Sequence, residues 1–334
     1  MSQIKTVSII TPCYNGEKFV HRLLDSVLDQ TYSSIEHIFI DDGSIDKTAE
    51  VINNYIPKYE KRGFKLIYVY QENAKAAAAL NSGLKLFTGE YLTWPDSDDY
   101  YRSSDAISIM VNAFENLSND YGIVRCDAML TEENTLQAIN TFSDKYSYVK
   151  KEKLFEDCLF EIDFWFTPGC YLTSASVLDS VIKNRDIFVN FDGQNWQMFL
   201  PILYRYKCFY IDKPLFNYLI RSDSYCNQPI SFELSLKRTF IHEEIIFETL
   251  KRINFKKDEL EFYNLQIKKK YLYKRYSLSC LYGETEEINK FYKEIKSNFL
   301  DNRPIRFLNF VLGILNNKSI LLNKLFVRLI NILN

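Results

Sequence analysis

Apolar and polar residues follow two different periods along the front half of the chain. Short apolar runs that end at polar or turn-forming residues are typical of buried parallel strands. Between them, apolar residues recur every three to four positions, which is typical of helices packed on one face. The expected strands are 7–11, 36–40, 65–70 and 90–94, and the expected helices are 17–30, 46–59 and 74–87. Strands that alternate with helices predict an α/β fold, with a mostly parallel sheet flanked by helices.

After residue 107 the alternation of strand-like and helix-like patterns is less regular. We expect helices at 103–117 and 193–206 and strands at 121–126 and 208–212, the last ending before Pro214. From about residue 233 the pattern is almost entirely helical. We therefore divide the chain into an α/β domain, residues 1–230, and a helical C-terminal region, residues 231–334.

Charge and cysteine content narrow the class of protein. Of the 334 residues, 47% are hydrophobic and 25% are charged, which is enough for a large core. The last 100 residues hold 19 Lys and Arg against 11 Asp and Glu and are therefore basic. Since the formal net charge of the whole chain is −2, the residues before them are acidic. Seven cysteines without a C-x-x-C pair argue against a disulfide framework or a zinc ribbon. Without a signal-peptide pattern or an apolar run of about 18 residues, we expect a cytoplasmic protein.

Two acidic signals directly follow expected strands. Asp41 and Asp42 come after one, and Asp96, Asp98 and Asp99 come after another. Open α/β sheets bind ligands at the carboxyl ends of their strands, so both signals should border one pocket. A lone D-x-D is usually a solvated turn, but carboxylates one residue apart suit Mg²⁺ or Mn²⁺. By contrast, His21, His37 and His242 are isolated and show no metal-ligand spacing.

The order of these signals resembles that of a known family. The segments are TPCYNGEKFVHRLLDSVLDQTY, IFIDDGSIDKT and QENAKAAAALNSGLKLFTGEYLTWPDSDD, within residues 5–105. In this order they resemble the nucleotide-sugar-binding half of family 2 glycosyltransferases, with the GT-A (Rossmann-like) fold. The resemblance implies an inverting, metal-dependent transferase that uses a nucleotide-diphosphate sugar, expected to be a UDP-sugar. It also implies a glycan or lipid-linked glycan acceptor, as in relatives that build bacterial surface polysaccharides.

The resemblance also implies roles for individual residues. The positions that correspond to donor-binding residues are Thr11, Pro12, Tyr14, Asn15, Asp42, Asn73, Lys75, Asp96, Ser97 and Arg221. Asp42 stands where the family bonds the base, and Asp96 and Asp98 stand where it holds Mn²⁺ or Mg²⁺. Plain alternatives are packing for Tyr14 and a solvated surface position for Lys75 and Arg221. Asp41 could cap a turn, and Asp99 is expected to support its loop.

The chain departs from the family at the general base. Relatives use an Asp in an E-D or G-D pair that opens a helix, and the corresponding stretch here is FDGQNWQMFLPIL (191–203). Asn195 takes the position of that Asp, and an amide cannot act as a base. We assign the catalytic role to Asp192, with Asp163 or loss of transfer as alternatives. Asp192 could instead cap the helix.

The basic C-terminal part of the chain suggests possible binding partners but does not identify them. KKKYLYKRY (268–276) is expected to be a solvated helix face and not a nucleic-acid site. Residues 303–334 carry five cations and no acid, with apolar residues on one helical face. This end could lie on the inner face of a membrane, pack on the chain's own helices, or form a homodimer.

Two other functions stay open. A non-catalytic nucleotide-sugar-binding or scaffolding subunit would explain Asn195. A sugar nucleotidyltransferase is disfavoured because no Gly-rich loop follows the first strand.

Overall fold

The computed structural model describes residues 4–146, 149–190, 193–221 and 231–298. The chain forms two compact units. The first takes in residues 1–229 and 241–261, and the second takes in residues 230–240 and 262–334. One helix, α9 (Phe232–Arg252), therefore contributes to both units.

Four parallel strands form the front half of the sheet in the first unit, in the order β3-β2-β1-β4. They are β1 (Val7–Cys13), β2 (Ile35–Asp42), β3 (Lys65–Gln71) and β4 (Tyr91–Thr93). Every residue of β2 is buried, as expected of a strand covered on both faces. All four predicted strands are confirmed. Because they run in one direction, the loops after β1, β2 and β4 meet at one edge.

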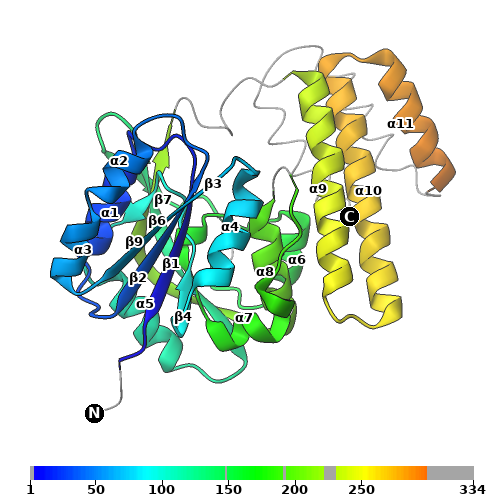
Figure 1. The fold of residues 1–334 in the computed structure, drawn as a ribbon. Coiled ribbons are helices and arrows are strands. Elements are labelled where there is room, and N and C mark those ends of the chain that lie inside the picture. The colour runs from blue at the N-terminus through cyan, green and yellow to red at the C-terminus, as the bar shows by residue number, and fades with distance from the viewer. Residues whose placement is uncertain (1–3, 147–148, 191–192, 222–230, 299–334) are drawn as a thin grey trace. The chain divides into compact units, whose positions relative to one another are not determined.

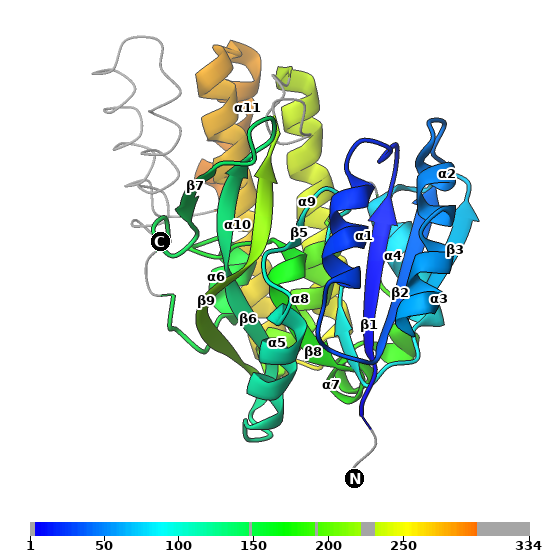
Figure 2. The same cartoon turned by 90° about the vertical axis from the view of Figure 1, so that its left-hand side faces the viewer.

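Helices cover both faces of this sheet (Figures 1 and 2). One face carries α1 (Val20–Leu28), α2 (Thr48–Asn53), α3 (Ile56–Arg62) and α5 (Ala106–Glu115). The other carries α4 (Lys75–Leu86), α6 (Phe155–Phe160), α7 (Ala175–Val181) and α8 (Gln194–Arg205). The prediction of a single helix over 46–59 is wrong. The chain forms α2 and α3 there because Pro57 has no N–H with which to continue the hydrogen bonds of α2.

The rear half of the sheet is mixed, and part of it was not predicted. It adds β8 (Tyr171–Ser174), β6 (Tyr121–Glu132), β9 (Lys207–Ile220) and β5 (Tyr100–Tyr101), while β7 (Ala138–Thr141) pairs with β6. The expected end of the strand before Pro214 is wrong, because β9 continues to Ile220. Pro214 pairs with Asp127, where the register between β6 and β9 shifts on both sides. Such a bulge accommodates a residue without an N–H. The longer strand carries Arg221 to the edge where the acidic loop lies.

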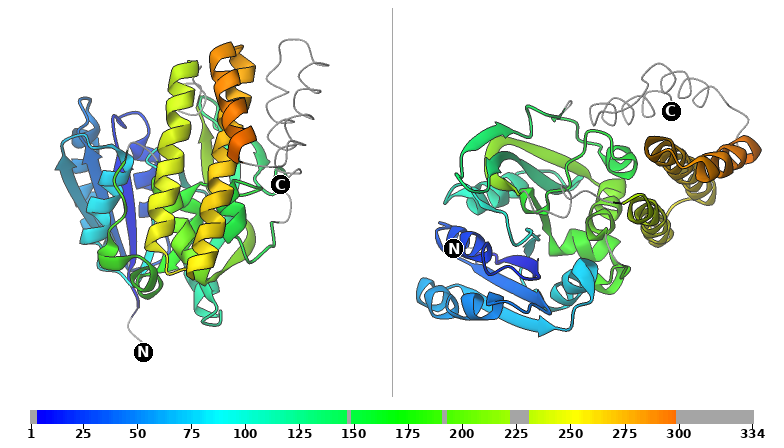
Figure 3. Two further views of the ribbon diagram at one scale, coloured as in Figure 1. Left: turned by 90° about the vertical axis from the view of Figure 1, so that its right-hand side faces the viewer. Right: turned by 90° about the horizontal axis from the view of Figure 1, so that it is seen from above.

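The second unit is helical, as predicted. Its helices include most of α10 (Lys257–Tyr282), which runs from yellow to orange in Figure 3, and all of α11 (Thr285–Asn298), the orange helix beside it. Leu272, Tyr273, Tyr276, Phe291 and Ile295 form their shared core. The tyrosines of the basic stretch 268–276 are buried, and its lysines are exposed or partly exposed. The expected solvated face is wrong for Arg275, which is 5% exposed and donates to Thr239 Oγ1 (3.1 Å).

Residues 303–334, for which we expected a membrane or helix contact, lie outside the described part of the chain. Within that part, no helix combines the length and the apolar character needed to cross a bilayer.

Candidate active site

The loops after β1 and β2 are joined by hydrogen bonds at the carboxyl edge of the sheet. Asn15 N donates to Ser44 Oγ (2.9 Å), and Gly16 N donates to Thr48 Oγ1 (2.7 Å). In return, Ile45 N donates to Asn15 Oδ1 (2.9 Å). Asn15 has a φ of +52°, in a left-handed region that asparagine tolerates better than most residues. The predicted donor loop is thus fixed to the loop that directly follows the first acidic pair.

Side chains of the first loop lie at different depths. Thr11 is fully buried, and its hydroxyl is hydrogen-bonded to His37 Nε2 (3.0 Å), so it supports the loop from beneath. Pro12 is partly buried. Tyr14 is 52% exposed, so its ring is open to a ligand at this edge.

Asp41 holds the turn after β2, in agreement with the alternative stated for it. Its carboxylate accepts from Ser44 N (2.9 Å) and from Tyr68 Oη (2.7 Å). Burial and this hydrogen bond raise the pKa of the Tyr68 hydroxyl. Both oxygens of the Asp41 carboxylate therefore already accept hydrogen bonds from the protein itself.

Asp42 organises the loop before α4. It is 3% exposed and accepts from Gln71 Nε2 (2.7 Å), Ala74 N (2.9 Å) and Lys75 N (2.8 Å). Lys75 has a φ of +74°, and both Asn73 and Lys75 are exposed. A carboxylate has about four acceptor positions, so these three hydrogen bonds from described residues leave one of them unused.

The acidic loop after β4 meets the other two loops around Cys13, the last residue of β1. Burial raises the pKa of the Cys13 thiol to about 12. A hydrogen bond with Ser97 opposes this effect, whereas nearby carboxylates, including Asp41 and Asp98, add to it. A Cβ added at Gly16 would lie 3.9 Å from Ser97 Oγ. Residues from all three loops therefore surround one point.

The carboxylates of the acidic loop lie in a region of strong negative charge. Burial, followed by the charge of Asp98, raises the pKa of Asp96 to about 7. Burial and the charges of both neighbours raise the pKa of Asp99 well above its usual range. Asp99 Oδ1 accepts from Leu219 N (2.9 Å), and its buried Oδ2 has no hydrogen-bond partner among the described residues. Asp99 thus fastens the loop to β9, as expected of a supporting residue.

Arg221 is the cation that β9 brings to this loop. Its Nη1 donates to Asp98 Oδ2 at 2.8 Å, and the two side chains are 18% and 27% exposed. The guanidinium also lies over the Phe19 ring, 3.8 Å from its centroid. Arg221, expected to clamp a diphosphate, therefore lies against the predicted metal ligand.

Asp96 and Asp98 supply the carboxylate oxygens that an open divalent-metal site would use. Mg²⁺ is usually bound by one or two carboxylates together with substrate phosphates. In the described part of the chain, no group of three or more His, Cys, Asp or Glu is arranged to hold a metal. The two carboxylates would therefore need further oxygen ligands from a substrate or water. The raised pKa of Asp96 and the orphan oxygen of Asp99 are what an added cation would relieve.

Comparison with known proteins identifies the family. The sequence profile of glycosyl transferase family 2 matches residues 8–182, just over half of the chain. The chain belongs to glycosyltransferase family 2. An uncharacterized glycosyltransferase of Rickettsia typhi is 35% identical over 199 residues, which cover 59% of each protein. Another from Rickettsia prowazekii is 36% identical over 173 residues, which cover 52% of this chain and 51% of the relative. The chain thus spans between half and three fifths of the length of these family 2 relatives.

Solved structures agree with the predicted GT-A fold. S. aureus TarS 1–349 in complex with UDP-GlcNAc has a TM-score of 0.58 at 16% identity, over 80% of this chain and 72% of TarS. The mannosyltransferase PcManGT of Pyrobaculum calidifontis, in complex with GDP-Man and Mn²⁺, has a TM-score of 0.54 at 15% identity, over 93% and 85% of the two chains. At these identities the likeness shows the fold alone.

The stretch that corresponds to the family 2 base is only partly described. Asp192, our candidate base, lies outside the described residues. The N-cap of α8 is Gly193, with a φ of +81°. Asn195 follows in the first turn, where its Oδ1 accepts from Trp94 Nε1 (3.4 Å) and its Nδ2 donates to Phe166 O (3.1 Å). Both functions of the amide are therefore in use at the position where we expect the family's carboxylate.

Several residues near the site were not singled out from the sequence. Gln71 holds Asp42, and Phe19 lies under Arg221. Phe19 is an apolar residue inside a predicted helix, and Gln71 directly follows a predicted strand. Neither position indicates a function from the sequence alone. Asp163, the second candidate base, has a φ of +48°. This backbone conformation is uncommon outside glycine and recurs at functional sites.

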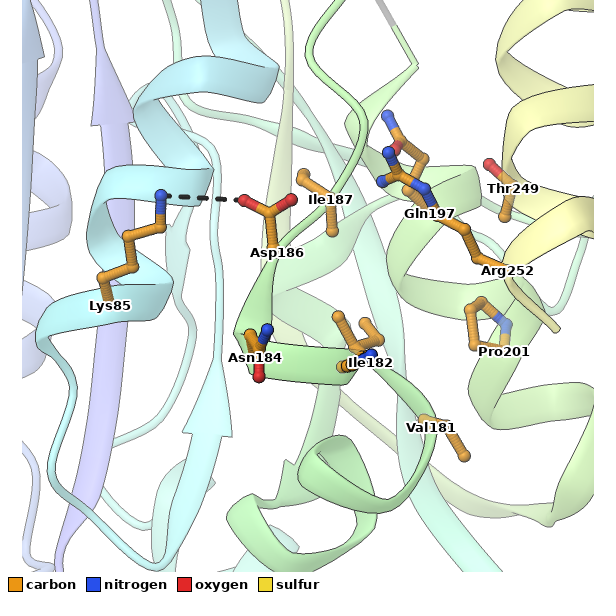
Figure 4. A pocket seen from close by; sticks show the side chains of 11 residues that line it. Lys85, Val181, Ile182, Asn184, Asp186, Ile187, Gln197, Pro201, Thr249 and Arg252 are labelled. Carbon is orange, nitrogen blue, oxygen red and sulfur yellow. Dashed lines mark ion pairs between the residues drawn. The ribbon is translucent and has the colours of Figure 1, made fainter.

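A separate cavity of about 500 Å³ lies in the first unit, away from the donor loops (Figure 4). Lys85 Nζ and Asp186 Oδ1 are 3.6 Å apart at its border, and Arg252 and Thr249 line another side. Lys85 is in the last turn of α4, whereas Lys75 begins that helix beside Asp42. Ten residues of helix separate the two lysines by about 15 Å. The cavity is therefore not the predicted donor pocket.

Proposed function

We propose that this chain transfers a sugar from a nucleotide-diphosphate donor, expected to be a UDP-sugar, to a hydroxyl of a glycan or lipid-linked glycan. The observation that carries the proposal is the meeting of three strand-end loops around Cys13, with Ser97, Asp41 and Asp98 as its neighbours. A pyrophosphate and its cation would be held at such a charged edge. The TarS complex with UDP-GlcNAc and the PcManGT complex with GDP-Man and Mn²⁺ support a nucleotide sugar as the donor class.

In this proposal the protein binds the donor at its base and at its diphosphate. Asp42 accepts from the ring N–H of the base, and the exposed ring of Tyr14 packs against it. Lys75 and Arg221 neutralise the diphosphate, for which a planar guanidinium is geometrically suited. Asn73 lies between the base and phosphate contacts. The exposed positions of Tyr14, Asn73 and Lys75 are compatible with these roles.

Asp96 and Asp98 would hold Mn²⁺ or Mg²⁺. The ion would act as a Lewis acid that stabilises the charge developing on the leaving nucleoside diphosphate. The reaction inverts the anomeric centre, because one base deprotonates the acceptor hydroxyl as it attacks from the side opposite the leaving group. We assign the base to Asp192, which precedes the N-cap of α8 by one residue.

The acceptor side of the proposal rests on the sequence. A lipid-linked acceptor would give the basic, amphipathic residues 303–334 a role at the inner face of a membrane. A second copy of the chain is the other partner proposed for that segment.

Calorimetry can test the donor and metal roles together. UDP-GlcNAc is titrated in the presence of Mn²⁺ into the wild type, into Asp98→Ala, and into Asp120→Ala as a control at an exposed surface carboxylate. We expect binding by the wild type and the control, and a loss of at least tenfold in Asp98→Ala. Equal affinity in all three would remove the metal role, and binding of GDP-mannose in place of UDP-GlcNAc would change the donor.

The second candidate is a non-catalytic sugar-nucleotide-binding subunit, which the amide at position 195 favours. Transfer and donor hydrolysis by Asp192→Asn separate the two functions. Full binding by the wild type, without turnover on any glycan acceptor, would favour the subunit. Full turnover by Asp192→Asn would show that the base is another residue.

A further inference from the structure

Asn195 forms hydrogen bonds with two groups, Trp94 and Phe166, that can each bond in only one direction. The indole N–H of Trp94 can only donate a hydrogen bond, and the carbonyl of Phe166 can only accept one. Asn195 lies between them with its oxygen 3.4 Å from Trp94 Nε1 and its nitrogen 3.1 Å from Phe166 O. The residue at this point must therefore present one acceptor and one donor.

A carboxylate does not meet this requirement. It would accept from Trp94, but its second oxygen would face the Phe166 carbonyl as a second acceptor. Two acceptors at about 3 Å repel each other, and the Phe166 carbonyl loses this partner. A protonated carboxyl group, in contrast, carries one O–H and would restore the donor. The amide is the neutral group of the same size that satisfies both neighbours.

Three segments that are distant in sequence meet at this amide. Trp94 precedes Asp96 by two residues and is 2% exposed, with its ring 5.4 Å from that of Phe199 on α8. Phe166 ends a loop in which Asp163 adopts a left-handed backbone conformation. The third segment is the first turn of α8. The amide thus links the stem of the acidic loop to the loop that presents Asp163.

We propose that Asn195 is a positioning residue whose amide holds the acidic loop and the 161–167 loop in the arrangement needed for transfer. The inference rests on the proposed function. It also implies that the amide is required here in its own right, and is not a degraded form of the family's base. Restoring the family's carboxylate at this position should reduce transfer.

The test compares Asn195→Asp with Gln194→Glu, which makes the same change of charge one residue earlier in the same helical turn. The melting temperature of each is measured between pH 5 and pH 8. We expect Asn195→Asp to be destabilised at pH 8 and to regain part of the lost stability towards pH 5, because its new carboxyl group becomes protonated in the folded state and can then donate to Phe166 O. The titratable groups on the adjoining elements are Asp96, Asp163 and His242. The same groups surround Gln194→Glu, so the pH dependence of that variant is the control for their titration.

Activity provides the second readout. At pH 7.5 we expect Asn195→Asp to lower kcat at least tenfold with an unchanged Kd for UDP-GlcNAc, and to recover part of kcat at pH 5.5 relative to wild type. Trp94→Phe removes the indole N–H together with part of the buried ring, so its effect on the hydrogen bond is read from the double mutant with Asn195→Ala. It should lower kcat in the same way, and less than additively with Asn195→Ala.

Two results would overturn the inference. One is an Asn195→Asp variant that transfers as fast as, or faster than, the wild type at pH 7.5, since that would mean that the position accepts a base. The other is a stability difference from wild type that does not change with pH. If the wild type neither binds nor transfers a nucleotide sugar, the proposed function fails, while the stability experiment still decides whether the amide is required.

Discussion

Replacing Arg221 by methionine should change metal and donor binding in opposite directions. In the structure Arg221 Nη1 donates to Asp98 Oδ2 at 2.8 Å, with side chains that are only 18% and 27% exposed. A charge-assisted hydrogen bond of this kind contributes about 1.5–3 kcal/mol. The guanidinium and a metal ion would compete for the same carboxylate. Removing Arg221 should therefore tighten Mn²⁺ binding in the absence of nucleotide by about tenfold, which corresponds to about 1.4 kcal/mol.

The same substitution removes a cation that we assign to the diphosphate. With Mn²⁺ saturating, Arg221→Met should therefore bind UDP-GlcNAc about tenfold more weakly. Methionine preserves apolar contact with the Phe19 ring, which limits the change to the lost charge. Opposite effects on the two ligands cannot come from a general loss of structure.

Electron paramagnetic resonance of free Mn²⁺ measures the first effect, and calorimetry with the donor measures the second. Arg102→Met is the matched control, because Arg102 is an exposed arginine that donates to Asn217 (3.3 Å) and not to the acidic loop. We expect this control to match the wild type in both assays. Unchanged or weaker Mn²⁺ binding by Arg221→Met, without nucleotide, would refute the competition.

Three further predictions concern stability. Glu36→Ala should lower the free energy of unfolding in urea by about 3 kcal/mol, because the buried carboxylate accepts from the Thr88 and Gly89 amides; a loss below about 1 kcal/mol would contradict this. Burial lowers the pKa of His37 to about 3 from 6.5, so its proton binds mainly to the unfolded chain. The contribution of His37 to the free energy of unfolding is therefore complete above pH 6.5 and falls as the pH drops, by about 2 kcal/mol at pH 5. His37→Asn should remove this pH dependence of the free energy of unfolding. Gly169→Ala should cost about 1–3 kcal/mol in the same assay, because its Cβ would overlap the Phe216 ring; wild-type stability would show that the ring moves aside without cost.

The parallel half of the fold could be predicted because each of its strands is a buried apolar run with polar residues at its end. The rear half could be predicted only in part. The strands expected at 121–126 and 208–212 are confirmed within β6 and β9, whereas β5, β7 and β8 were not expected, because these short strands depend on partners that are distant in sequence. The two residues of β5 are recognised as a strand only through their pairing with β9. Pro214 suggested a strand end, and the bulge opposite Asp127 that accommodates it is a property of the pairing.

The candidate site shows the same division. The types and order of Asp42, Ser97 and Asp98 predicted that their loops would share one edge, and the surroundings of Cys13 agree with this. Single-residue contacts were not predictable. The sequence does not reveal that Thr11 lies in the core or that Arg221 bonds to Asp98, since both depend on how separate segments pack.

Helix α9 limits how this chain could be shortened or recombined. Its first residues belong to the second unit, where Arg275 bonds to Thr239. Its remainder belongs to the first unit, where the ring of His242 lies 5.0 Å from that of Trp196 in α8. A protein cut at residue 230, where the sequence pattern changes, would lose part of the first unit. Exchange of C-terminal regions between relatives would therefore have to retain residues 241–261, which belong to the first unit.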